Sequence, residues 1–293
     1  MRSLIAITLL SWAVAAGAQP IDTLKRIADT GTINLGHRES SVPFSYYDNR
    51  RQVVGYSHEL MLRVLDAIKV ELNLPALTIK LVPVTPQNRL ALVQNGAVDI
   101  ECGSTTHNTE RARQVAFSVS IFKIGTRLIT GRDSGIHDFP DLRGKRVAVT
   151  GATTSERLLR MFNESIGGKF TIVVAKDHGE SFALLEGGRV DAFMMDDALL
   201  YGERAKAQHP ERWVVVGMPM SSEVYGCVMR SADRSLKRIV DQSLRQIMQS
   251  GEALRIYSKW FERPIPPRGL NLNWPASDAM LELYRVPNDR PVD

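Results

Sequence analysis

The chain has 293 residues, of which 44% are hydrophobic and 24% charged, and its formal net charge is +5. This length supports one large domain or two medium ones, each with an ample core. Acidic and basic residues are interleaved without a basic tract, which excludes the nucleic-acid-binding class and predicts no nucleic-acid partner.

The N-terminus has the pattern of an export signal. Arg2 precedes a mostly apolar run at residues 4–16, and Ala16-Gly17-Ala18 matches the small-x-small cleavage pattern. The run is too short to cross a bilayer as a helix, so the alternative is an N-terminal helix buried in the core. We expect residues 1–18 to be a cleaved signal peptide and the mature chain to be secreted.

Strand and helix patterns alternate along the rest of the chain. A first series has strands at 32–35, 77–84 and 98–102 and helices at 57–72, 87–94 and 109–115, followed by an extended segment at 121–130. A second series has strands at 146–150, 171–175 and 190–195 and helices at 154–163, 180–186 and 197–207. This alternation is typical of α/β folds with parallel sheets. The tail is predicted to be helical over 232–260, interrupted at Gly251, and then an irregular proline-rich strap.

An internal repeat predicts two equivalent lobes. Residues 91–100 and 183–192 both read as a helix end, a glycine-containing turn and a buried strand. Ser104 and Asp196 follow the two repeats at the same spacing. If the lobes face each other, both side chains look into one cleft.

Two arginines follow strand ends, where open α/β sheets bind small molecules. Arg38 lies among hydroxyl and aromatic side chains after the strand at 32–35 and indicates a clamp for a small organic anion. Thr85 and Pro86 are predicted to start the next helix. Arg89 would then oppose the helix dipole in the first turn, which favours an anionic partner over the alternative of a solvated surface arginine.

Two further segments offer hydroxyls and backbone N–H groups. Ser104, Thr106 and Arg111 lie in a segment that predicts a carboxylate cradle, and capping of the helix there can coexist with binding. Thr153 and Glu156 have capping-box spacing in a glycine-led turn that leaves N–H groups free for an anion. The Gly-Lys-Ser/Thr ending of a nucleotide P-loop is missing.

An acid and a histidine complete the candidate site. Asp196 could pair with an ammonium group or cap a helix, and His178 could donate to a carboxylate or be structural. Catalytic motifs and metal-ligand spacings are missing, so we expect neither a metal nor a cofactor. The excess of arginines over acids describes a ligand with more negative than positive charge. Cys102 and Cys227, the only cysteines, form a disulfide or remain two buried thiols.

Distinctive segments carry a resemblance to a known family: GHRESSVPFSYYDN, ECGSTT, AKDHG, AFMMDDALL, GERAKA, YGC and RPIPP. From about residue 24 to 287, the chain resembles the periplasmic solute-binding proteins of polar amino-acid ABC importers (family 3), above all their glutamate/aspartate-binding group. The resemblance implies a type II periplasmic-binding-protein fold with hinged α/β lobes, each with a mostly parallel sheet. It places lobe 1 at 22–122 plus 227–293, lobe 2 at 126–222, and hinge crossings near 123–125 and 223–226.

The resemblance also implies a function and a set of binding residues. The protein would be a periplasmic monomer that captures glutamate or aspartate and delivers it to the membrane permease of an ABC importer. The strands that bear Cys102 and Cys227 would be neighbours, which favours the disulfide. The implied ligand-binding residues are Arg38, Arg89, Ser104, Thr106, Arg111, Thr154, His178 and Asp196.

By the same resemblance, Arg111 binds the ligand's α-carboxylate, assisted by Thr106 and the turn at Thr154. Asp196 and Ser104 would hold the α-ammonium.

Arg38, Arg89 and His178 would receive the side-chain carboxylate. Pro86 stands where the group has a serine, which leaves the preference between glutamate and aspartate open. The alternatives are an enzyme on the same scaffold, such as a cyclohexadienyl dehydratase, and a ligand sensor for a receptor. Such an enzyme needs a general acid in its pocket. The predicted arginine-rich cleft offers no spare acid for this role except Glu39, which we expect to be structural.

Overall fold

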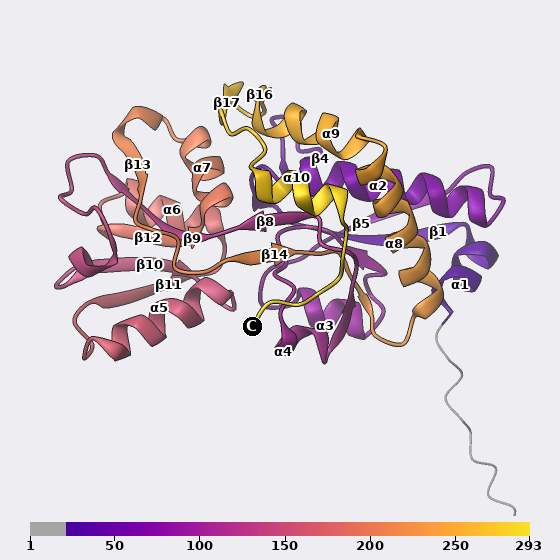
Figure 1. Ribbon diagram of the computed structural model, residues 1–293, viewed down its shortest axis with the longest axis horizontal. Helices are drawn as coiled ribbons and strands as arrows, with labels where there is room; N and C mark the ends of the chain where they lie inside the picture. Colours follow the sequence, from indigo (N-terminus) through magenta and orange to yellow (C-terminus); the bar gives the residue numbers. More distant parts are fainter. Residues whose placement is uncertain (1–21) are drawn as a thin grey trace, which may run out of the picture.

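The computed structural model describes residues 22–293, so the predicted signal peptide at 1–18 lies outside the described residues. The chain forms two lobes, each built on a five-stranded sheet flanked by helices (Figure 1). Strands β8 and β14 run between the lobes in the middle of the view. No helix within residues 22–293 is long and apolar enough to span a membrane.

Lobe 1 is built on a sheet with the strand order β5-β1-β6-β15-β7. Its strands are β1 (Thr32–His37), β5 (Thr78–Pro83), β6 (Ile100–Glu101), β7 (Val115–Phe117) and β15 (Val228–Arg230). Strand β1 pairs in parallel with β5 and β6, whereas β15 is antiparallel to β6 and β7. The helices of this lobe are α1 (Thr23–Thr30), α2 (Tyr56–Glu71), α3 (Arg89–Gln94), α4 (Thr109–Ala112), α8 (Arg234–Gln249) and α9 (Glu252–Phe261).

Lobe 2 is built on a sheet with the order β11-β10-β12-β9-β13. Its strands are β9 (Thr126–Gly131), β10 (Arg146–Thr150), β11 (Thr171–Ala175), β12 (Ala192–Asp196) and β13 (Trp213–Val216). Strand β9 is the antiparallel member, paired with β12 and β13. The helices are α5 (Thr154–Ser165), α6 (His178–Glu186) and α7 (Asp197–Lys206), with 3₁₀ turns η1 (Phe139–Leu142) and η2 (Pro210–Arg212).

The two sheets share one topology. In each, the strand that runs against its neighbours is the one that enters directly from the hinge, β15 in lobe 1 and β9 in lobe 2. The other strands point the same way, so the sheets are mostly parallel in strand direction, as predicted. The repeats at 91–100 and 183–192 lead into β6 and β12, which hold the same place in the two sheets. The predicted equivalence of the lobes is therefore confirmed at the level of topology.

The hinge consists of β8 (Phe122–Ile124) and β14 (Glu223–Tyr225), which pair antiparallel. These strands overlap the crossings predicted near 123–125 and 223–226. Aromatic packing anchors them to lobe 1, because Phe44 lies 4.8 Å from the Phe122 ring and 5.1 Å from the Tyr225 ring, centroid to centroid. Both hinge strands therefore pack against the aromatic core of lobe 1.

The C-terminal part agrees with the prediction only up to residue 261. Gly251, with φ at 79°, separates α8 from α9 as expected. The segment predicted to be irregular contains the short pair β16 (Pro264–Ile265) and β17 (Leu270–Asn271) and helix α10 (Asp278–Arg285). Helix α1 and a small sheet of β2 (Ser40–Ser41), β3 (Ser45–Tyr47) and β4 (Val53–Val54) were also not predicted.

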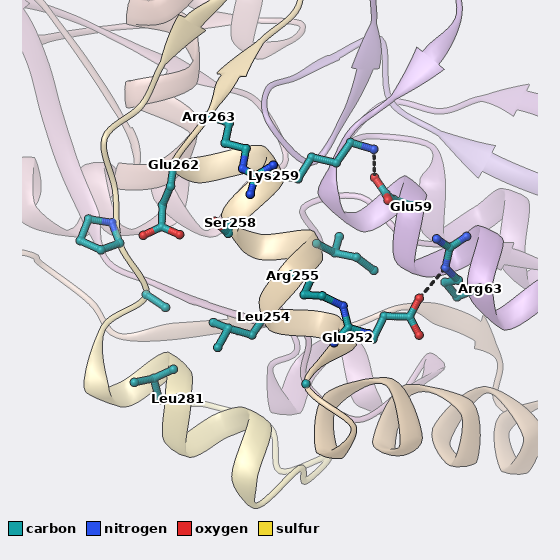
Figure 2. Close-up of a pocket in the computed structure, with 14 residues that line it drawn as sticks. Glu59, Arg63, Glu252, Leu254, Arg255, Ser258, Lys259, Glu262, Arg263 and Leu281 are labelled. Atoms are coloured by element: carbon teal, nitrogen blue, oxygen red, sulfur yellow. Dashed lines mark hydrogen bonds and ion pairs between the residues drawn. The ribbon is translucent and has the colours of Figure 1, made fainter.

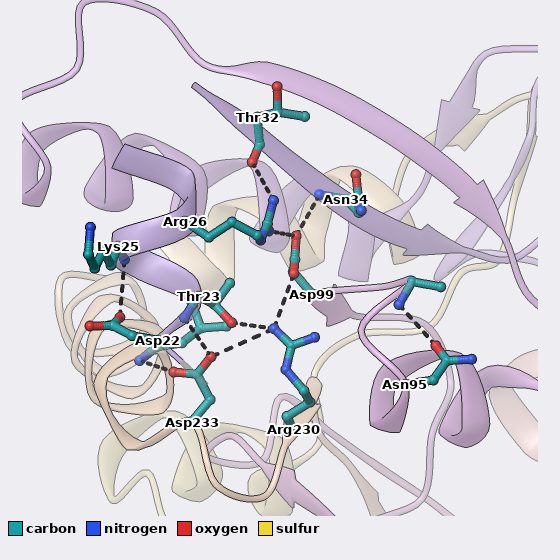
Figure 3. A network of polar contacts seen from close by, with 12 residues as sticks. Asp22, Thr23, Lys25, Arg26, Thr32, Asn34, Asn95, Asp99, Arg230 and Asp233 are labelled. Atoms are coloured by element: carbon teal, nitrogen blue, oxygen red, sulfur yellow. Dashed lines mark hydrogen bonds and ion pairs between the residues drawn. The ribbon is translucent and has the colours of Figure 1, made fainter. Parts of the chain in front are cut away.

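A polar network around the buried Asp99 joins α1 to the sheet of lobe 1 (Figure 3). Asp99, whose side chain is fully buried, accepts hydrogen bonds from Arg26 of α1, Arg230 of β15 and the backbone N–H of Asn34 in β1. Arg230 also donates to the hydroxyl of Thr23. The network joins the first helix to the strands that carry the arginine-bearing loops.

A disulfide joins Cys102 and Cys227, with their Cα atoms 4.3 Å apart. Cys102 directly follows β6, and Cys227 directly precedes β15, the neighbouring strand of the sheet. The predicted pairing of the two cysteines is confirmed.

Candidate functional site

A small pocket between the lobes collects the predicted residues. It encloses about 210 Å³ of empty space and is lined by Arg38, Arg89, Ser104, Thr106, Arg111, Thr153, Thr154, His178, Met195 and Asp196. All eight residues predicted from the sequence line it; Thr153 and Met195 were not predicted. Lobe 1 supplies the arginines and lobe 2 supplies the histidine and the aspartate, so the pocket is complete only when the lobes meet.

The inner arginines, Arg38 and Arg89, are 1% and 2% exposed. Burial and the neighbouring Arg89 lower the pKa of Arg38 to about 10, and Glu101 opposes this shift. Nη1 of Arg38 and Nε of Arg89 have no hydrogen-bond partner among residues 22–293. Buried cations with free donors are costly unless an anion pairs with them, so this end of the pocket is built for a negative group.

Arg89 is positioned differently from the prediction. Helix α3 begins at Arg89, and the predicted start at Thr85 and Pro86 is wrong. The reason is a turn in which the Asn88 side chain accepts the Thr85 N–H at 2.8 Å, and this turn closes before the helix begins. Arg89 Nη1 donates to the Ser104 carbonyl at 3.1 Å, which aims the guanidinium along the end of β6.

Arg111 lies at the other end of the pocket, in the short helix α4. Asn108 caps this helix by accepting the Arg111 N–H at 2.9 Å, so capping and pocket lining coexist as predicted. The guanidinium donates to the carbonyl of Thr106 in lobe 1 at 3.1 Å and to that of Ala152 in lobe 2 at 3.4 Å. Burial and Arg89 lower its pKa to about 10, so it stays cationic at neutral pH.

His178 begins α6 and is almost fully buried. Its Nδ1 lies 3.0 Å from the Thr150 hydroxyl, and its Nε2 has no partner among the described residues. Burial, followed by Arg38 and Arg89, lowers its pKa well below 6.5. The ring is therefore neutral. The Ser181 hydroxyl donates to the Asp177 carbonyl, so the single hydrogen of Thr150 goes to Ser181 and Thr150 accepts from Nδ1–H of His178. Nε2 of the neutral ring then carries no hydrogen, and it can donate to an anion only when the ring takes up a proton.

Asp196 ends β12 and precedes α7, yet its side chain makes no capping bond. The carboxylate instead accepts hydrogen bonds from the Tyr225 hydroxyl and, at 3.1 Å, from Ser155. Burial and the neighbouring Glu223 raise its pKa to about 7. A cation placed beside it would reverse this shift, which suits an ammonium group.

The turn at 150–156 adopts half of the predicted capping box. Thr153 accepts the Glu156 N–H at 3.1 Å, as predicted, but the Glu156 carboxylate accepts from Ala152 N–H at 2.8 Å instead of from Thr153. Ala152 has φ at 58°, and this left-handed turn brings its N–H within reach of the acid. Thr154, the first residue of α5, then faces the pocket.

Glu223 and Tyr225 of the hinge strand were missed from the sequence. They occupy alternate positions of β14, so both side chains lie on the same face of the strand. Glu223 accepts hydrogen bonds from the hydroxyls of Thr106 and Thr154, at 2.7 and 2.8 Å. The sequence feature that could have identified them is an acid and a tyrosine two residues apart, in a segment predicted to cross between the lobes.

A groove with a larger empty space, about 1390 Å³, lies on lobe 1, along α9 (Figure 2). Its rim is charged, but Lys259 pairs with Glu59 and Arg63 pairs with Glu252, each at 2.7 Å. None of the predicted binding residues lines it. Within residues 22–293, no group of His, Cys, Asp and Glu side chains could hold a metal ion. The interlobe pocket is the candidate site.

Two α/β lobes, joined by paired hinge strands and closed over a charged pocket, define a type II periplasmic binding protein. The profile of the bacterial extracellular solute-binding proteins, family 3, matches residues 33–263, and the chain belongs to this family.

Relatives with curated names cover nearly the whole chain. The chain is 52% identical to the L-glutamate/L-aspartate-binding protein of Pseudomonas aeruginosa, over 99% of both chains. It is 53% identical to a glutamate/aspartate import solute-binding protein of Salmonella typhimurium, over 96% of this chain and 92% of the relative. These relatives are binding proteins and not enzymes.

Solved structures share the fold. A cysteine-binding protein from Campylobacter jejuni superposes with a TM-score of 0.72 at 22% identity, covering 82% of this chain and 93% of that one. A histidine-bound uptake-transporter protein from Streptococcus pneumoniae gives 0.73 at 19% identity, covering 84% and 98%.

Proposed function

We propose that this protein captures L-glutamate or L-aspartate in the interlobe pocket and delivers it to an ABC importer. The observation that carries the proposal is the pair of unpartnered guanidinium donors at the inner end, on Arg38 and Arg89. A second carboxylate on the ligand would accept from both, and its negative charge would favour a protonated His178 that donates from Nε2. The names of the relatives support the same ligand class.

The remaining pocket residues suit the amino-acid end of the ligand. Arg111 offers a guanidinium fork for the α-carboxylate, and the backbone N–H groups at the start of α5 lie across the pocket from it. Asp196 and Ser104 would hold the α-ammonium. The site thus matches a zwitterion that carries an additional negative charge.

The mechanism is binding by lobe closure. Gln87 of lobe 1 donates to the carbonyls of Gly151 and Lys176 in lobe 2, at 3.1 and 3.2 Å, so the described arrangement is closed. A ligand that contacts both lobes shifts the population toward this form. The lobes would comprise 22–122 plus 227–293 and 126–222, and the closed monomer would dock on the permease in the periplasm after removal of the signal peptide.

A ligand screen by thermal shift tests this function. The ligand-stripped protein should be stabilised by L-glutamate or L-aspartate, and glutamine, arginine, histidine and prephenate should give little or no shift. A shift with prephenate alone would favour the enzyme alternative. Glu39, the acid that such an enzyme would need, is exposed and does not line the pocket.

A further inference from the structure

Glu223 joins both lobes through a single carboxylate oxygen. Its Oε2 accepts from Thr106 of lobe 1 at 2.7 Å and from Thr154 of lobe 2 at 2.8 Å, and its Oε1 accepts from Ser221 at 3.1 Å. The side chain is buried, with the residue 5% exposed. Three hydroxyl groups therefore donate to one carboxylate, which lies beside the pocket without lining it.

The backbone holds Glu223 in place from the side of lobe 1. Thr106 forms an isolated bridge with Tyr225, and the N–H of His107 donates to the Val224 carbonyl at 2.9 Å. The distance from Glu223 to Thr106 is therefore set by the local fold. Thr154 belongs to α5 of lobe 2, so its bond to Glu223 depends on how the lobes are arranged.

These bonds also determine what the threonines can offer a ligand. A hydroxyl has one hydrogen, and both threonines donate theirs to Glu223. Only oxygen lone pairs remain for the pocket, so both side chains are acceptors there. Acceptors suit the N–H groups of an ammonium and repel a carboxylate, whereas the resemblance implied a carboxylate-side role for both threonines.

We propose that Glu223 is a positioning residue that orients the Thr106 and Thr154 hydroxyls toward the ligand's ammonium and latches the two lobes in the closed form. The inference rests on the proposed function, because it assigns the ammonium end of the same pocket. Glu223 acts through the threonines and adds its negative charge behind them.

Glu223→Gln tests the orientation. The amide keeps the shape but removes the negative charge and leaves one neutral acceptor oxygen, so the two threonines lose the charged acceptor that orients them. By isothermal titration calorimetry, the Kd for L-glutamate should rise at least about tenfold. Asp233→Asn is the matched control, since Asp233 is 2% exposed, caps α8 and does not line the pocket. It should bind like the wild type, and a Glu223→Gln Kd within threefold of wild type would overturn the proposal.

A double-mutant cycle tests whether Glu223 affects ligand binding through the Thr154 hydroxyl. Thr154→Val removes the hydroxyl with little change of shape and should weaken binding about as much as Glu223→Gln. Because both changes break the same link, the double variant should lose far less than the product of the two effects. Additive losses would overturn the link. If Glu223→Gln does not fold, Thr106→Val and Thr154→Val carry the test, and unchanged affinity in both would contradict the proposal.

The latch can be measured without ligand. Spin labels at Val70→Cys and Met161→Cys, at exposed positions in lobes 1 and 2 (81% and 54%), report the distance between the lobes by pulsed electron resonance. Glu223→Gln should shift the ligand-free distribution toward longer distances, and an unchanged distribution would count against the latch. If the wild type binds no acidic amino acid, the proposed function fails, while this measurement still tests the latch.

Discussion

The Arg111 guanidinium donates to a backbone carbonyl of each lobe across the closed pocket. A substitution of Arg111 would therefore affect both ligand binding and lobe closure. Arg111→Ala should weaken glutamate binding by on the order of 2–5 kcal/mol, because it leaves a buried carboxylate without its partner. Calorimetric titration measures the loss. Arg113→Ala removes an exposed arginine two residues away that does not line the pocket, and it should leave the Kd unchanged. Near-native binding by Arg111→Ala would remove the assigned role.

Asp196 should make ligand binding release a proton. Its pKa in the ligand-free fold is about 7, against 3.8 as the ordinary value, and Glu223 contributes to the rise. A ligand ammonium favours the ionised form, so the pKa falls on binding and affinity rises as pH increases from about 5.5 to 7.5. Titrations at pH 6 in buffers of different ionisation enthalpy measure the released proton. A binding enthalpy independent of the buffer would refute the linkage.

The same shift has the opposite sign for the stability of the free protein. Between pH 3.8 and about 7, the folded state holds a proton on Asp196 that the unfolded chain has released. The contribution of Asp196 to the free energy of unfolding therefore falls as pH rises through this window. Asp196→Asn should flatten this part of the stability–pH curve in chemical denaturation, and an unchanged curve would contradict the assignment.

The candidate site was predictable where its residues follow strand ends. Arg38, Ser104 and Asp196 were found because the carboxyl ends of parallel strands share one edge of a sheet. Glu223 was missed because its contacts are long-range in the sequence: its partners Thr106 and Thr154 are 117 and 69 residues away. No local pattern reveals such a contact.

At the scale of elements, α7 packs closely against lobe 1. A Cβ atom on Gly202 would lie 2.1 Å from the carbonyl oxygen of Val42 in lobe 1. Gly202→Ala should therefore disfavour closure, while lobe 2 gains roughly 1 kcal/mol of helix propensity. We expect a Kd increased at least about tenfold, equivalent to about 1.4 kcal/mol, without a loss of thermal stability.

Gly179→Ala is the matched control. This glycine also lies in a helix of lobe 2 that faces lobe 1, but its added Cβ would find only ordinary contacts, at 3.4 Å or more. Its Kd should match the wild type. Wild-type affinity in Gly202→Ala would show that the contact with Val42 does not control closure.

The elements themselves were predictable where hydrophobic periodicity is strong, as in helices α8 and α9. The break between them was predictable because Gly251 interrupts the pattern. Helix α10 was missed because the prolines before it suggested an irregular tail, although Ser277 caps it by accepting the Met280 N–H. The start of α3 was misplaced because a turn between Thr85 and Asn88 outcompeted the local capping signal.

At the scale of the whole molecule, the disulfide closes a loop that contains the whole of lobe 2. Cys102 and Cys227 are 125 residues apart, and both belong to lobe 1. The combined Cys102→Ala and Cys227→Ala variant should lose roughly 2–4 kcal/mol of unfolding free energy, as measured by urea denaturation. Because the bond does not join the lobes, the Kd for glutamate should stay within a few-fold of wild type. A large loss of affinity in the folded variant would show that the bond controls closure.

The pocket as a whole is organised by charge, with three arginines and one acid, Asp196, lining a small space. Calorimetric titration of the ligand-stripped protein with L-glutamate and L-glutamine tests this most directly, because the two ligands have nearly the same shape and differ in one negative charge. We predict that glutamate binds at least about a hundredfold more tightly, a difference of about 2.7 kcal/mol. Tighter binding of glutamine, or of a cationic amino acid, than of every dicarboxylic amino acid would contradict the account.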